Sequence, residues 1–306
     1  MKTRMIVLLF LFSGYFNSNA TSISGKNISF LEEGDSIIIF LDKIGSTSID
    51  PDLNDIYSAI YKKNEFSVSI NIGMRPQYLD VAYYRNGQKF GTKLIGLLLE
   101  KGDSILMHSG SDKLMFSGKG SITWIIQMQI FDIRDYYSHK MDYNESKIKF
   151  TESISDSLYD STFRCLSKNK NSLSMPVYSL LKADIIGIVN LRYNYIINIS
   201  VSVKNVRGLI DSILSYRTLL SKRMISLAVD ELPFARFSKY YSAGILSEYT
   251  FDSCVVPNKS LDIDRYILFV DKYFLGRINE KLKTNALYKV RRMGEFRGIT
   301  SRYLPI

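Results

Sequence analysis

The chain has 306 residues, and its composition of 46% hydrophobic and 23% charged residues excludes wholesale disorder. The length suits one large domain or two ordinary ones. Forty lysines and arginines against 30 acidic residues give a formal net charge of +10. Residues 272–306 hold nine basic and two acidic side chains, so most of the positive excess lies in this C-terminal segment.

The first 20 residues have the layout of a secretory signal peptide. Lys2 and Arg4 precede the apolar run 5–12, and small or polar residues lead to Ala20. The run is too short to cross a hydrocarbon core of about 30 Å, and no later stretch is apolar enough for a transmembrane segment. We expect cleavage after Ala20 and an exported protein of the periplasm or cell envelope that begins at Thr21. An uncleaved anchor is the alternative.

Residues 21–120 have the texture of a β-rich module. Asn86 and Gly87 stand between two apolar runs, which predicts a tight hairpin turn. One helix is expected at 50–64, with Asp50 as N-cap and Pro51 at the first helical position. Runs rich in Ile, Val, Phe and Tyr between turn residues predict strands at 36–42, 66–72, 78–84, 93–100, 104–109 and 113–118.

The pattern L-E-x-G-D-S-I occurs twice in this module, from Leu31 and again from Leu99. Gly34 and Gly102 permit a positive φ angle, and the aspartate after each glycine can accept hydrogen bonds from the backbone of its own turn. Each copy therefore predicts a strand, a tight turn and the next strand. The flanking residues differ between the copies, so we interpret the repeat as hairpin chemistry and not as a duplicated domain.

After Gly120 the apolar residues recur at helical spacing. Helices are predicted at 121–137 with Ser121 as N-cap, and after Ser174, which precedes Pro176. The remaining predicted helices lie at about 153–170, 206–224, 235–249 and 261–287. The sequence thus predicts an α+β protein, in which an antiparallel β-sandwich-like module at 21–120 is followed by a helical region at 121–306.

The chain has two cysteines, Cys165 and Cys254. An exported chain meets an oxidising compartment, so they are candidates for one disulfide. Two buried, unpaired thiols are an equally good interpretation. Neither cysteine lies in a C-x-x-C pattern, which excludes a thioredoxin-type redox centre in this chain.

Several local patterns resemble sites without completing them. His108 and His139 could take part in a metal site or a catalytic relay, but surface or strand-edge positions are favoured. The run from Asp50 begins like a calcium loop and then fails, since Asp55 stands where glycine is needed and Tyr61 where glutamate is needed. The glycine-rich stretch 117–121 could hold an anion, but a plain strand-to-helix connection is favoured.

The basic C-terminal segment has aromatic residues among its charges, a combination that could contact an acidic protein or an anionic membrane surface. Nucleic acid is disfavoured as a partner because the chain is expected to be exported, and a solvated helix face is the plainer alternative. The candidate partner-binding residues are Lys281, Lys283, Lys289, Arg291, Arg292 and Arg297.

In the stretch 97–121, an E-x-G-D-S turn and a short aspartate-containing loop lead to F-S-G-K-G-S. This stretch resembles a recurrent feature of Bacteroidota envelope proteins of the TlpA-like thioredoxin family. Residues 174–187 resemble the helical segment of the same proteins. In that family a β-module and a helical segment precede a thioredoxin domain. The C-x-x-C of that domain is missing here, so the resemblance implies the non-catalytic region alone, as a short relative or a truncated product.

These observations predict a non-catalytic exported binding or accessory module that presents a surface to an envelope protein or another ligand. No catalytic residue, metal ligand or cofactor is assigned. The alternative is a hydrolase-type enzyme with a site between the β-module and the helical region. A remnant without an independent function is a third interpretation.

Overall fold

The computed structural model describes residues 21–42, 54–111, 113–140, 148–202, 232–235 and 262–273, with a few further positions between 237 and 283. The chain divides into two compact units. The first comprises Met1–Met141 and Asp156–Lys182, and the second comprises Asp142–Ser155 and Ala183–Ile306. The fold is α+β, with the strands N-terminal and the helices after them, as the sequence predicts.

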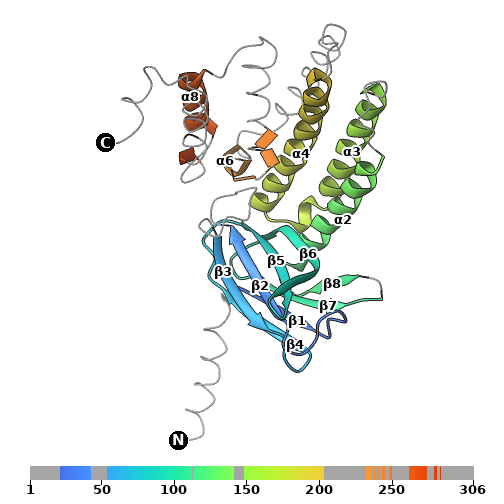
Figure 1. Cartoon of the computed structure of the whole chain (residues 1–306), viewed down its shortest axis with the longest axis vertical. Helices are drawn as coiled ribbons and strands as arrows, with labels where there is room; N and C mark the ends of the chain where they lie inside the picture. The colour runs from blue at the N-terminus through green and yellow to red at the C-terminus, as the bar shows by residue number, and fades with distance from the viewer. Residues whose placement is uncertain are drawn as a thin grey trace, which may run out of the picture. The chain divides into compact units, whose positions relative to one another are not determined.

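The strands of the first unit form two four-stranded sheets (Figure 1). Strand order is β4-β1-β7-β8 in the first sheet and β3-β2-β5-β6 in the second. All neighbours are antiparallel except β1 and β7, which run parallel. The strands are β1 (Thr21–Lys26), β2 (Ser36–Asp42), β3 (Asn54–Ile60), β4 (Glu65–Ile70), β5 (Gln77–Arg85), β6 (Gln88–Leu99), β7 (Ser104–Ser109) and β8 (Leu114–Ser117).

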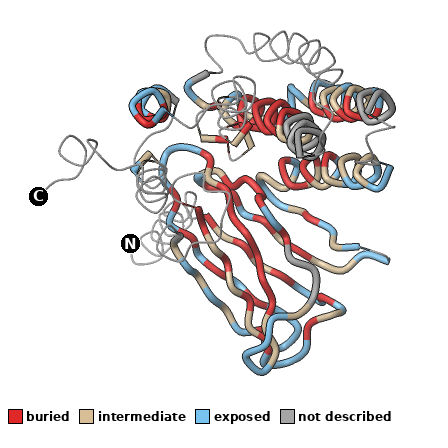
Figure 2. Tube along the Cα trace, turned by 45° about the horizontal axis from the view of Figure 1, so that its top comes forward, coloured by how far each residue is buried: buried red, intermediate tan, exposed pale blue. Residues whose placement is uncertain are grey.

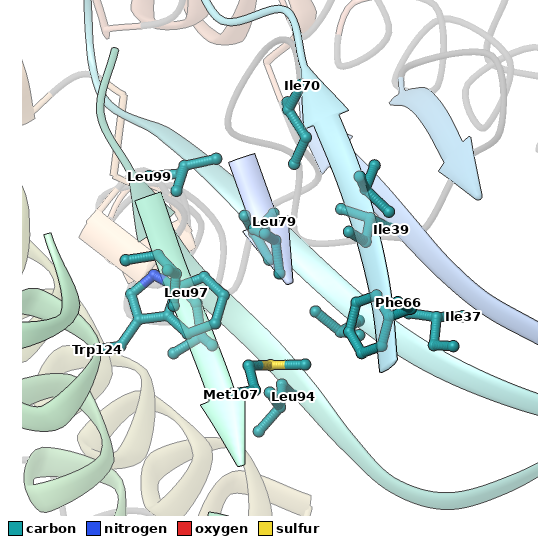
Figure 3. Packing of buried hydrophobic residues seen from close by; sticks show 14 of the residues in the cluster. Ile37, Ile39, Phe66, Ile70, Leu79, Leu94, Leu97, Leu99, Met107 and Trp124 are labelled. Carbon is teal, nitrogen blue, oxygen red and sulfur yellow. The ribbon is translucent and has the colours of Figure 1, made fainter. Parts of the chain in front are cut away.

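The inner faces of both sheets share one hydrophobic core (Figure 3). In β4 the residues Phe66, Val68 and Ile70 are buried and their neighbours are exposed, because successive side chains of a strand point to opposite faces. Figure 2 shows the same alternation of buried and exposed positions along several strands. Trp124, the single tryptophan of the chain, enters this core from a helix and is fully buried.

The predicted helix at 50–64 is wrong, because residues Asn54–Ile60 form strand β3. Residues 50–53 lie outside the described part. Every residue of β3 pairs with β2, from Ser36 opposite Ile60 to Asp42 opposite Asn54. This pairing satisfies the backbone of both strands, and such long-range hydrogen bonding outweighs the local N-cap signal on which the prediction depended.

The two L-E-x-G-D-S-I turns have the predicted geometry. Gly34 has a φ angle of 93° and Gly102 one of 84°. The Oδ2 atom of Asp35 accepts a hydrogen bond from the backbone N–H of Glu32 at 2.8 Å. Asp103 accepts the equivalent bond from the backbone N–H three residues earlier, also at 2.8 Å.

The interpretation of these turns as hairpins is wrong, because each turn lies on a connection between the two sheets. The first precedes β2 of the second sheet on the connection from β1, and residues 27–30 lie between β1 and the turn. The second joins β6 of the second sheet to β7 of the first. The predicted hairpin at Asn86 and Gly87 is confirmed: both residues have positive φ angles, and Arg85 pairs with Gln88.

The helices are α2 (Ser121–Ser138), α3 (Ile148–Lys168), α4 (Met175–Ser202), α6 (Leu232–Ala235) and α8 (Ile263–Tyr273), and a short 3-10 turn spans Lys170–Ser172. Ser174 caps α4 as predicted, since its Oγ accepts a hydrogen bond from the N–H of Val177 at 3.3 Å. The predicted helix at 206–224 lies outside the described residues. In the part of the chain that the structure describes, no helix combines the length and apolarity needed to cross a membrane.

Ser121 is not the N-cap of α2. That position is held by Gly120 with a φ angle of 84°, and Ser121 is the first helical residue. A Cβ atom on residue 120 would lie 2.3 Å from the carboxylate of Asp103, so a side chain does not fit there without displacing the second turn. The start of α2 is thereby held directly against that turn.

In the second unit, α4 packs closely against Ser238, Tyr240 and Tyr241. The Oγ of Ser238 donates to Oδ1 of the buried Asp184 at 2.5 Å and accepts from the N–H of Tyr241 at 3.0 Å. A Cβ atom at Gly187 would lie 2.1 Å from the carbonyl carbon of Tyr240, so the contact requires glycine. These contacts are structural and bring no reactive group to the surface.

Candidate functional site

The first turn holds a cluster of charges in which every group is engaged. Arg85 donates two hydrogen bonds to Asp35, at 2.9 and 2.8 Å, one to Glu32 at 2.6 Å and one to the backbone oxygen of Phe30 at 3.2 Å. Its guanidinium also lies 4.5 Å from the ring centroid of Phe90. The hydrogen bond from Arg85 holds the pKa of Asp35 below its ordinary value. The arrangement stabilises the connection between the sheets.

The second turn has no arginine in the equivalent place. Burial raises the pKa of Asp103, which is the opposite direction from Asp35. Other side chains bond to this turn: the N–H of Gly102 donates to Oγ1 of Thr21 at 2.8 Å, and the hydroxyl of Ser174 donates to the carboxylate of Glu100 at 2.7 Å. Both turns are thus used to join secondary-structure elements.

Helix α2 is attached to β6 through two buried side chains. Trp124 Nε1 donates to the backbone oxygen of Leu98 at 2.8 Å. Gln127 bonds at both ends of its amide, accepting from the N–H of Leu98 at 2.8 Å and donating to the oxygen of Gly96 at 3.0 Å. Next to them, the N–H of Gly96 donates to Asp80 at 2.7 Å, where the register of β5 and β6 shifts. These bonds fix the position of α2 beside the sandwich.

A groove of about 500 Å³ lies beside α2, between the edge strands of the two sheets. Its size is within the range of ligand-binding pockets. Its rim is polar and includes Ser29, Ser109, Ser111, Lys113, Gln129 and Asp132. Its floor is apolar and is formed by Phe30, Leu94, Leu114, Phe116, Ile125 and Met128.

The rim carries two charges that no described group neutralises. Lys113, just before β8, and Asp132, on α2, are both exposed, and neither forms an ion pair with another described residue. The serines at the other end are already bonded, since Ser109 Oγ donates to Ser29 Oγ at 2.9 Å. Lys113 and Asp132 are therefore available to orient a ligand whose apolar part occupies the floor.

Cys165 lies behind one wall of this groove. Its thiol donates to Oε1 of Gln129 at 3.6 Å, and it is a free thiol in the structure. Burial raises the pKa of the Cys165 thiol, which keeps it protonated and a poor nucleophile at neutral pH. Cys254 lies outside the described residues, so the disulfide between the two stays a prediction.

Of the six predicted partner-binding residues, the structure describes Lys283. Its Nζ forms an ion pair with Asp271 of α8, and this contact holds the pKa of Asp271 below its ordinary value. Lys283 is therefore occupied within its own unit. The other five, Lys281, Lys289, Arg291, Arg292 and Arg297, lie outside the described residues.

The remaining patterns form no site among the described residues. His139 is exposed and its Nε2 lies 3.4 Å from Asp135, while His108 lies on β7, an inner strand. The described residues contain no group of three or more histidine, cysteine or acidic side chains that could hold a metal ion. The glycine-rich stretch at 117–121 connects β8 to α2 directly.

The sequence analysis missed the groove because its walls come from segments far apart in the chain. Ile125 and Met128 lie within the predicted helix at 121–137, and nothing near them in sequence indicates that part of its apolar face is left open. The same holds for the alternating residues of β8.

No protein-family model matches the chain, and a search of curated proteins finds no match.

Proposed function

We propose that the chain is a non-catalytic exported binding or accessory module, and that the groove beside α2 is its ligand site. The observation that carries this proposal is the combination of an apolar floor with two rim charges, Lys113 and Asp132, that pair with no other described residue. Such sites hold the apolar body of a ligand by burial and orient it with a few polar groups. The ligand is therefore an amphipathic molecule or chain segment.

A binding role also fits the chemistry of the first unit better than the hydrolase-type alternative. Among the described residues that line the groove, Asp132 is the one carboxylate, and no histidine or cysteine accompanies it. The carboxylates of the two turns are committed to hydrogen bonds that join strands and helices. A reaction would need an acid, base or nucleophile that faces the ligand.

Dye binding tests the groove. We expect 1-anilinonaphthalene-8-sulfonate to fluoresce on binding the full chain, and Ile125→Trp to abolish the increase by filling the floor. Ile122→Trp is the matched control, because Ile122 is exposed on the same helix and does not line the groove. The urea midpoint of each variant shows whether it is folded. The groove would be excluded as the site if both variants lost the fluorescence increase equally, or if a folded Ile125→Trp protein kept it.

Export is supported by the signal-peptide layout of residues 1–20, which predicts cleavage after Ala20. Mass spectrometry of the protein from its native host should find Thr21 as the first residue. An intact Met1 on protein from the cell envelope would contradict cleavage. We further propose that the chain is related to the non-catalytic part of TlpA-like envelope proteins, which the stretch at 97–121 supports.

A further inference from the structure

We infer that the groove takes an extended peptide of a partner protein, which adds as an antiparallel strand to the free edge of β8. This inference rests on the proposed function and names the kind of ligand. It is carried by the hydrogen-bond register of β8, by the residues that line the groove and by the charge of Lys113.

The register shows which backbone groups of β8 are free. The N–H of Ser104 donates to the oxygen of Lys119 at 2.9 Å, and that of Gly110 donates to the oxygen of Lys113 at 2.8 Å. In an antiparallel pair such hydrogen-bonded positions alternate with non-bonded ones. Met115 and Ser117 therefore bond to β7. Leu114 and Phe116, the alternate positions, direct their N–H and C=O groups away from β7.

The opposite edge of β8 has no neighbouring strand. β8 is the last strand of its sheet, and no described residue forms a hydrogen bond with the outward backbone groups of Leu114 or Phe116. An unpaired strand edge is a template for the addition of another strand. Two consecutive outward positions offer four hydrogen bonds to one added strand.

The groove follows this edge. Lys113, Leu114, Met115 and Phe116 are consecutive residues whose side chains alternate between the two faces of the sheet, yet all four line the groove. A hollow on one face alone would be lined by every second residue. Four strand residues span about 13 Å, which is room for about four residues of a peptide.

The side chains around the edge specify the peptide. Residues opposite Phe116 and Leu114 point to the floor, which favours apolar side chains at these two positions. The residue opposite Lys113 lies on the other face, where an acidic side chain would pair with the Lys113 ammonium group, which forms no ion pair with a described residue. The expected pattern is apolar, any residue, apolar, acidic, written from the end opposite Phe116.

The test uses nine fluorescent peptides of the form Ser-Φ-Thr-Φ-Glu-Ser, in which each Φ is Leu, Ile or Phe, titrated into the full mature chain. We expect at least one to bind with a Kd below about 1 mM. N-methylation at both Φ positions removes the donors directed at β8 and should weaken binding at least about tenfold. N-methylation of Thr and Glu is the matched control and should cost less than about threefold, because these N–H groups point away from β8.

Two measurements on the protein complete the test. Lys113→Glu should weaken the binding of the glutamate peptide and strengthen that of its lysine analogue. Lys101→Glu, at an exposed lysine outside the groove, should change the affinity of neither peptide. Hydrogen exchange should show the amides of Leu114 and Phe116 unprotected in the free protein and protected in the complex.

The outcomes separate the two proposals. If the dye requires an open groove but none of the nine peptides binds, the peptide inference is wrong and the binding site stands. If dye binding does not depend on the groove, both the proposed ligand site and the peptide inference are wrong. Equal weakening by both N-methylation patterns would overturn strand addition, and so would a concentration-dependent dimer that the peptides dissociate, because a second copy would then occupy the edge.

Discussion

Replacing Gln127 by leucine should destabilise the first unit. Gln127 is buried, and its amide satisfies the N–H of Leu98 and the C=O of Gly96. Leucine has a similar volume but leaves both backbone groups without a partner. Each unsatisfied buried group costs about 1–3 kcal/mol, and the gain from the added apolar surface is about 1 kcal/mol. With two such groups, the expected net loss is about 1–5 kcal/mol.

Urea unfolding followed by tryptophan fluorescence measures this loss in the full chain. The single tryptophan, Trp124, is buried in the core of the first unit, so its emission reports on that unit. At a urea dependence of about 2 kcal/mol per M, a loss in the middle of this range lowers the midpoint by about 1.5 M. The slope should stay unchanged, because the surface exposed on unfolding is the same.

The control is Gln129→Leu, two residues further along the same helix. Gln129 is exposed and receives one weak hydrogen bond from a thiol, so its replacement should change stability by less than about 0.5 kcal/mol. A Gln127→Leu protein within that same limit would refute the reasoning. It would mean that the two amide bonds do not hold α2 on the sandwich.

The two turns should differ in their response to pH, because the pKa of Asp35 is lowered and that of Asp103 is raised. Ionised Asp35 stabilises the fold above its ordinary pKa of 3.8, and this stabilisation is lost as the pH falls, so Asp35→Asn should destabilise the protein at pH 7 but not in acid. Ionisation of buried Asp103 costs stability as the pH rises through its raised pKa, so Asp103→Asn should remove that cost. Equal pH profiles of the two variants would contradict this. Gly34→Val and Gly102→Val should each cost about 1–3 kcal/mol in urea unfolding, through backbone strain at positive φ; an unchanged midpoint would exclude it. A chain that ends at Asp271 should lose any sedimentation with anionic vesicles that a chain of residues 21–306 shows at ~20 mM salt. Equal sedimentation of the two would exclude the basic C-terminal segment as the contact.

Local sequence patterns were enough to predict those features of the fold that depend on residues close together in the chain. Phe66, Val68 and Ile70 alternate because a strand buried on one face must alternate. Asn86 and Gly87 form the hairpin turn because few other residue pairs adopt two successive positive φ angles. Gly34 and Gly102 also adopt the predicted positive φ angles. The α+β class follows from the change from strand-like to helical spacing of apolar residues after residue 120.

Only the tertiary structure decided which segments meet. Residues 54–60 follow the helix start signal at Asp50 and Pro51, yet they form β3 because β2 offers a complete row of hydrogen-bond partners. The same turn sequence holds Asp35 against an arginine 50 positions away and leaves Asp103 without one. Lys283 is not free for a partner because Asp271 binds it.

The groove shows the physical reason most clearly. Its lining comes from the loop before β2, from β6, from β7 and β8, and from α2, and each of these segments alone reads as ordinary strand or helix. Propensity and periodicity indicate which face of a helix or strand is apolar, but they do not indicate which other segment of the chain packs on that face. Whether an apolar face becomes core or remains open is decided by the sum of many distant contacts, and that sum exists only in the folded chain.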